Sequence, residues 1–129
     1  MQYKDLKVGD IIKSLEDGLA YYVIDLSNSL IMRIGSEPDA LFDAWRCLLS
    51  DAEPIPLSEG LLNKIGSIDH FGLGLSFKFK KARVCSFDNK FEFQSKNTKK
   101  KIKYLHELQH ELWDEGININ FNVIGLIDN

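Results

Sequence analysis

The order of apolar and polar residues predicts a strand-rich first part of the chain. Three stretches rich in β-branched and aromatic residues run from Val8 to Lys13, from Leu19 to Leu26 and from Leu30 to Ile34. Glycine, Asn, Asp and Ser gather between them, as expected of tight turns. The segment from Leu41 to Leu49 stays ambiguous, because its apolar spacing fits a helix while so short a run also fits a strand.

The middle of the chain predicts a short helix with clear signals at both ends. Pro54-Ile55-Pro56 should be extended, because a proline disfavours the α conformation of the residue before it. Ser58 is the expected N-cap, and Gly66 is the expected left-handed C-terminal cap.

Strict alternation then predicts strands between Leu75 and Phe93. Phe77 and Phe79 should point to one face of a sheet and the lysines between and after them to the other. Asp88-Asn89 is expected to form the turn before the next strand.

The last third predicts one longer amphipathic helix from Thr98 to Asp114. Its apolar residues recur at three- and four-residue steps, and they are Ile102, Leu105, Leu108 and Leu112. We expect this stripe to contact Phe77, Phe79, Phe91 or Phe93. Gly116 should end the helix, and Ile117 to Val123 should form a closing strand.

These elements predict an α+β fold in one domain of residues 1–129. A strand-rich part covers residues 1–57, and a part with a helix, strands and a second helix covers residues 58–129. The chain has 44% hydrophobic and 27% charged residues, which is the balance of a globular protein.

Composition also bears on the compartment. No apolar run approaches the ~20 residues needed to span a bilayer, and the first residues do not resemble a signal peptide. Cys47 and Cys85 lie far apart outside any Cys-x-x-Cys pair, so we expect both to be reduced. We therefore expect a cytoplasmic protein without a membrane partner.

Charge is unevenly distributed along the chain. The stretch from Lys78 to Lys103 holds ten basic residues against two acidic ones, a balance of +8, although the whole chain carries −3. Lys99, Lys100 and Lys101 fall at the expected helix start, where the helix dipole disfavours cations. Either the helix begins later or these lysines face an acidic partner, so they are candidate polyanion-binding residues. The simpler interpretation is that the lysines are solvated.

One short motif resembles a zinc hydrolase site. His106 and His110 would lie one turn apart on the helix, with Glu107 placed as a possible general base. A catalytic zinc needs a third protein ligand, and Trp113 stands where the extended motif requires glycine. We therefore interpret His106 as a hydrogen-bonded residue at the core edge and His110 as solvated, and we expect no metal or other cofactor.

Three stretches of the chain resemble one family. They are Leu6-Lys7-Val8-Gly9-Asp10, Pro54-Ile55-Pro56-Leu57-Ser58-Glu59 and Tyr104-Leu105-His106-Glu107-Leu108-Gln109. The pattern is similar to that of small bacterial proteins of unassigned function, often from prophages or other mobile elements. The resemblance implies a compact cytoplasmic domain with a small β-barrel-like first half. It includes His106, but Asn is usual where this chain has His110, so it does not imply a pair of metal ligands.

The sequence thus favours a non-enzymatic binding or accessory module whose partner is an unknown protein or an acidic partner. Two alternatives stay open. One is a zinc-dependent hydrolase that uses His106, Glu107 and His110. The other is a module that binds nucleic acid or another polyanion weakly through the stretch from Lys78 to Lys103.

Overall fold

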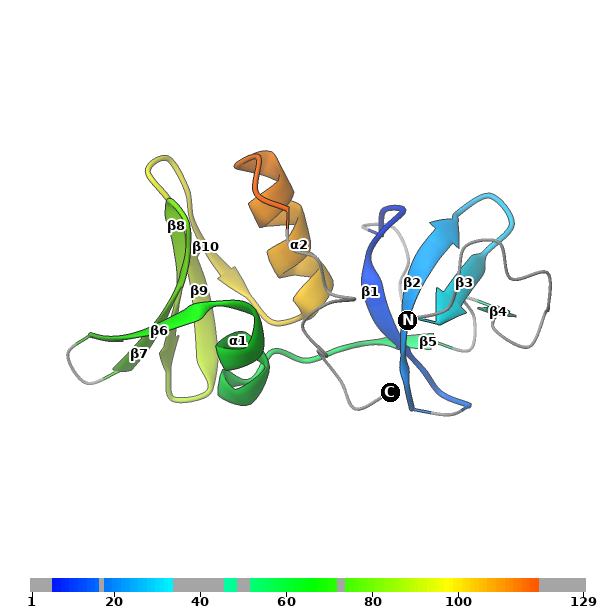
Figure 1. Ribbon diagram of the computed structural model, residues 1–129, viewed down its shortest axis with the longest axis horizontal. Helices are drawn as coiled ribbons and strands as arrows, with labels where there is room; N and C mark the ends of the chain where they lie inside the picture. The colour runs from blue at the N-terminus through cyan, green and yellow to red at the C-terminus, as the bar shows by residue number, and fades with distance from the viewer. Residues whose placement is uncertain (1–5, 17, 34–45, 49–51, 72–73, 119–129) are drawn as a thin grey trace. The chain divides into compact units, whose positions relative to one another are not determined.

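The computed structural model describes residues 6–16, 18–33, 46–48, 52–71 and 74–118, and of 32–33, 46–48 and 69–71 it describes the backbone alone. The chain divides into two compact units, one that ends at Ile55 and one that begins at Pro56 (Figure 1). This division lies two residues before the expected boundary between the two parts. Among the described residues, each unit contains an antiparallel sheet, and two helices follow the first sheet along the chain, so the α+β class is confirmed.

The first unit is a five-stranded antiparallel sheet in the order β4-β3-β2-β1-β5. Its strands are β1 Ile11–Ser14, β2 Ala20–Asp25, β3 Leu30–Arg33, β4 Arg46–Leu48 and β5 Ala52–Pro54. Within the ambiguous segment, residues 46–48 are a strand, and 41–45 and 49 lie outside the described residues. The order is linear, with β4 and β5 at its edges, and a barrel-like closure is not among the described strand pairs.

The first landmark of the resemblance shapes the start of β1. Gly9 has a φ of 97°, which favours glycine, and its N–H donates to the carbonyl of Val23 at 2.8 Å. Oδ2 of the buried Asp10 accepts from the N–H of Lys7 at 2.8 Å. Leu6 joins the buried cluster of this sheet. These residues therefore serve the fold.

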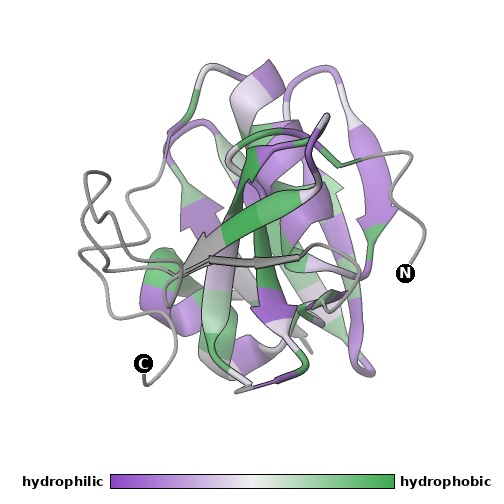
Figure 2. Cartoon of the chain, turned by 90° about the vertical axis from the view of Figure 1, so that its right-hand side faces the viewer, coloured by the Kyte–Doolittle hydropathy of each residue, from purple (hydrophilic) through white to green (hydrophobic). Residues whose placement is uncertain are grey.

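The second unit contains a five-stranded antiparallel sheet in the order β10-β9-β8-β7-β6. Its elements are α1 Glu59–Ile65, β6 Ser67–Phe71, β7 Gly74–Phe79, β8 Ala82–Phe87, β9 Lys90–Gln94, β10 Lys99–Ile102 and α2 Leu105–Asp114. The strands carry both hydrophobic (green) and hydrophilic (purple) residues (Figure 2). No helix among the described residues is both long and apolar enough to cross a membrane.

The predicted alternation in this sheet is confirmed. Phe77, Phe79, Phe91 and Phe93 are buried, whereas Lys78 is exposed. The predicted turn between β8 and β9 is confirmed as well. Both of its residues have positive φ angles, 52° and 60°, as a tight two-residue hairpin turn requires.

The predicted start of the last helix is wrong. Residues 99–102 form the edge strand β10, which pairs with β9, and α2 begins only at Leu105. Ile102 lies opposite Phe91 and is buried with it, so cross-strand packing outweighs the helical preference of the lysines. The N-terminus of α2 thereby avoids the unfavourable cluster of cations.

The predicted conformation of Gly66 is also wrong. Gly66 follows α1 with φ −132° and ψ 173°, so it is extended, and the chain runs straight into β6. A Cβ at this position would lie 2.9 Å from Cζ of Phe79 and 3.0 Å from the carbonyl oxygen of Lys78. The glycine therefore permits a close approach to β7. The N-cap prediction is confirmed, since Oγ of Ser58 accepts from the N–H of Leu61 at 3.1 Å.

Helix α2 closes the second unit. Its residues Leu105, Leu108 and Leu112 are all buried, as the apolar stripe predicts. Gly116 has a φ of 74°, and the N–H of Ile117 donates to the carbonyl of Leu112 at 2.8 Å, which completes a Schellman motif. Ile117 and Asn118 belong to no strand, and the remainder of the expected closing strand lies outside the described residues.

Candidate functional site

The two histidines of the zinc-like motif lie side by side on α2. The ring centroids of His106 and His110 are 5.8 Å apart, and the rings meet edge to face. Tyr104 stacks on His106 at 5.9 Å, and Trp113 stacks on His110 at 5.7 Å. His106 is only 3% exposed, and His110 is half-buried. The histidines thus form part of a row of aromatic rings along the helix.

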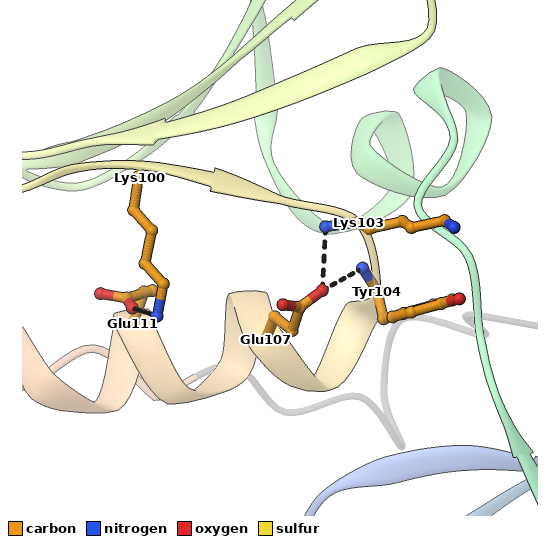
Figure 3. Close-up of polar contacts among 5 residues, drawn as sticks. All are labelled: Lys100, Lys103, Tyr104, Glu107 and Glu111. Atoms are coloured by element: carbon orange, nitrogen blue, oxygen red, sulfur yellow. Dashed lines mark hydrogen bonds and ion pairs between the residues drawn. The ribbon is translucent and has the colours of Figure 1, made fainter. Parts of the chain in front are cut away.

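Glu107 is engaged at the start of α2. Its Oε1 accepts from the backbone N–H of Lys103 at 3.0 Å and from that of Tyr104 at 2.9 Å (Figure 3). These donors precede the first turn, where backbone N–H groups have no partner within the helix. Glu107 therefore satisfies the helix start as the Glu of a capping box does.

Within the part of the chain that the structure describes, no three His, Cys, Asp or Glu residues come together in a group that could hold a metal ion. Glu115 and Asp128 are two of the acids downstream of the motif. Glu115 accepts from Oγ of Ser95 at 2.6 Å. Asp128 lies outside the described residues.

The strand register gathers cations on the outer face of the second sheet. Lys78 of β7 lies opposite Arg83 of β8, Arg83 opposite Gln94 of β9, and Gln94 opposite Lys99 of β10. Side chains directly opposite one another share a face, so these four form one row across adjacent strands. Lys101 lies two residues farther along β10 and shares this face. We call Lys78, Arg83, Lys99 and Lys101 the basic face.

An acid lies within the basic face. Oε1 of Glu92 accepts from Nε2 of Gln94 at 2.8 Å and lies 3.7 Å from Nζ of Lys99. The Lys99 side chain is still 74% exposed. An exposed ion pair of this length contributes little to stability, so Lys99 can leave Glu92 and pair with an external anion.

Lys100 does not belong to the basic face. It lies opposite Phe93, on the face that the sheet buries, and its Nζ lies 3.1 Å from Oε1 of Glu111 on α2 (Figure 3). The structure thus brings Lys99 and Lys101 together and separates Lys100 from them. Sequence reasoning did not identify Lys78 and Arg83 as site residues. The two-residue period of the strands and the positions of the turns could have indicated that they share a face with Lys99.

A shallow pocket of about 260 Å³ extends the basic face at the turn between β7 and β8. Its cationic lining residues are Lys78, Lys80, Lys81 and Arg83. Lys80 has a φ of 54°, so the turn holds it in the left-handed region. Four cations around one depression favour an anionic occupant.

Comparison of the chain with protein-family models, with curated proteins and with solved structures found no match. The candidate site therefore rests on its own geometry.

Proposed function

We propose that the protein is a non-enzymatic module that binds a polyanionic partner through the basic face. The observation that carries this proposal is the row of Lys78, Arg83 and Lys99 across the outer face of the second sheet. Neighbouring strands are ~4.8 Å apart, so three steps span roughly 14 Å, enough to contact several charges of an extended polyanion.

The distribution of charge supports a localised site. The stretch from Lys78 to Lys103 carries a balance of +8, whereas the remainder of the chain has six basic and 17 acidic residues. The acidic remainder repels a polyanion, so only this region attracts one. Because exposed charges are screened by salt, binding should be weak and should fall as ionic strength rises.

The engagement of Glu107 argues against the zinc-hydrolase alternative. A general base must reach the proton that it removes, whereas Glu107 already accepts two backbone N–H groups.

The residues that carry the family resemblance have structural roles. Glu59 accepts from Oγ of Ser86 at 2.9 Å, and Leu105 and Leu108 are buried, so they maintain the fold. A cytoplasmic accessory role agrees with that resemblance.

Retention on a heparin column with a salt gradient tests this proposal. Combined replacement of Lys78, Lys99 and Lys101 by Gln should make the protein elute at clearly lower salt. Lys100→Gln is the matched control for the single variant Lys101→Gln, which should also elute at lower salt, because each removes one positive charge from β10, on opposite faces. Lys100→Gln should elute as the wild type does.

Columns of single-stranded DNA and of polyglutamate would then separate a nucleic-acid partner from an acidic protein. In titrations with the preferred probe, each lost contact should reduce the slope of log affinity against log salt by about 1. The proposal would be contradicted if the wild-type protein flowed through all three columns at low salt. It would also be contradicted if Lys100→Gln lowered the elution salt as much as replacement of a lysine of the basic face.

A further inference from the structure

The outer edge of β10 carries backbone groups that point away from the sheet. Two hydrogen bonds fix the alternation: the N–H of Ser95 donates to the carbonyl of Thr98 at 2.8 Å, and that of Leu57 donates to the carbonyl of Lys103 at 2.9 Å. Inward and outward residues alternate along an edge strand. The even-numbered residues from 98 to 102 therefore face β9, and the odd-numbered residues from 99 to 103 face outward.

The outward groups differ in what they contact. At Lys103 both are satisfied, since the N–H donates to Glu107 at 3.0 Å and the carbonyl accepts from Leu57. At Lys99 and Lys101, no described residue is hydrogen-bonded to the outward N–H or carbonyl. Beside these two residues, β10 can accept another strand.

The chain itself begins such a strand and then leaves. Pro56 forms an antiparallel bridge with Tyr104, and Leu57 follows it along the outer edge of β10. Ser58 then caps α1, and Glu59 receives a hydrogen bond from Ser86 of β8, two strands in from the edge. The helix therefore turns away from Lys101 and Lys99.

A pocket of about 370 Å³ lies at the point where the chain leaves this edge. Its apolar lining residues are Pro56, Leu57, Phe91 and Ile102. Its cationic lining residues are Lys90, Lys101 and Lys103, all of them exposed. The pocket fits an apolar side chain that is flanked by acidic groups.

We propose that the edge of β10 binds an extended acidic segment of a partner protein as an added strand. Acidic residues at every second position would lie opposite Lys99 and Lys101, and an apolar side chain would enter the pocket. A second copy of this edge would place lysines opposite lysines, so the charges select an acidic segment. This inference rests on the proposed function, and it uses only the part of the basic face at the sheet edge, Lys99 and Lys101, together with backbone pairing.

A labelled peptide, Leu-Glu-Thr-Glu-Thr-Glu-Thr-Glu, is the probe, and fluorescence anisotropy at low salt measures its binding. Two control peptides carry N-methyl groups on alternate residues, on the odd-numbered residues in one peptide and on the even-numbered residues in the other. Both keep every charge. In one of them the methyl groups replace the N–H hydrogens that would face β10, so that peptide cannot pair with the strand. That peptide should bind at least about ten-fold more weakly. Equal binding of all three peptides would overturn the inference.

Two variants at one position separate charge from backbone pairing. Lys101→Gln removes the charge, and Lys101→Pro also removes the outward N–H, which contributes no hydrogen bond to the existing ladder. The proline variant should bind the peptide roughly two- to ten-fold more weakly than the Gln variant. Equal affinities in folded variants would contradict strand addition.

Amide hydrogen exchange on the wild-type protein keeps the test independent of the variants. Exchange at Lys99 and Lys101 should slow when the peptide is bound, whereas Lys100 and Ile102 should already exchange slowly. Unchanged exchange at Lys99 and Lys101 together with intact heparin retention would reject strand addition and leave the proposed function standing. If exchange at Lys99 and Lys101 stayed unchanged and the protein also failed to bind heparin, both strand addition and the proposed function would be rejected.

Discussion

Nζ of Lys100 lies 3.1 Å from Oε1 of Glu111, which joins the edge strand β10 to helix α2. The Glu111 side chain is only 13% exposed, whereas that of Lys100 is 59% exposed. The pair therefore lies at the rim of the helix–sheet interface. Strand alternation directs Lys100 away from the basic face, and Glu111 is its partner on that side of the sheet.

This pair should contribute modestly to stability. A double-mutant cycle with Lys100→Gln and Glu111→Gln should give a coupling of about 0.5–1 kcal/mol, since one partner remains hydrated. Urea denaturation of the four proteins measures it. A coupling of zero would show that the helix docks without this contact.

Leu108 should be a main determinant of stability in the second unit. Its side chain is fully buried, so Leu108→Ala should lower the free energy of unfolding by ~2–5 kcal/mol. Ile68→Thr is the control, because Ile68 is 43% exposed and Thr keeps the β-branched shape. Thermal denaturation compares them, and an unchanged melting temperature for Leu108→Ala would contradict the core assignment.

Asp25 should make stability fall at low pH. Oγ of Ser27 donates to its carboxylate at 2.7 Å, and Asn28 donates as well, which lowers the pKa of Asp25 from 3.8 to about 2. Between these values the unfolded chain binds more protons than the folded protein, so protonation favours unfolding. The contribution of Asp25 is present above pH 4 and is lost as pH falls through about 2.

Two measurements check this behaviour. An NMR titration of the Asp25 carboxyl carbon should have its midpoint near pH 2. Denaturation of Asp25→Asn should show a smaller loss of stability between pH 4 and pH 2 than the wild type. A midpoint near the ordinary value of 3.8 would show that the turn bonds do not persist in solution.

The sequence predicted an element correctly where its apolar residues fitted only the strand period or only the helix period. It failed where the same residues fitted both periods. Phe77 and Phe79 alternate with lysines over a long enough run to exclude a helix. Between Thr98 and Leu105 the single apolar residue Ile102 suits either a strand that faces Phe91 or a helix that continues into α2. The choice depends on a partner strand eleven residues earlier, which a local pattern cannot contain.

The basic face was predictable in charge but not in geometry. Counting residues located the cationic stretch, yet only the register across the hairpins sends Lys99 outward and Lys100 inward. Gly66 shows the same limit, because a glycine after a helix usually indicates a left-handed cap. Here it admits the ring of Phe79, a contact made across twelve residues of chain.

The histidines of α2 should not bind zinc stoichiometrically. His106 is buried against the rings of Tyr104 and His110, and among the described residues no third ligand completes a metal-binding group with the two histidines. Elemental analysis of protein purified without chelator or nickel resin should find far less than one zinc per chain. Near-stoichiometric zinc that is lost on His110→Ala would restore the hydrolase interpretation.

Glu107 should stabilise the start of α2. Glu107→Ala removes the acceptor of two N–H groups at the start of α2 and should cost about 1 kcal/mol. Glu107→Gln keeps an amide oxygen that can accept the same bonds, so its loss should be smaller. Asp114→Ala is the control, since Asp114 lies in the last turn, where the helix dipole disfavours an acid. Urea denaturation ranks the three variants. If Glu107→Gln destabilised as much as Glu107→Ala, the charge and not the hydrogen bonds would hold the helix start, because only the charge is lost in both.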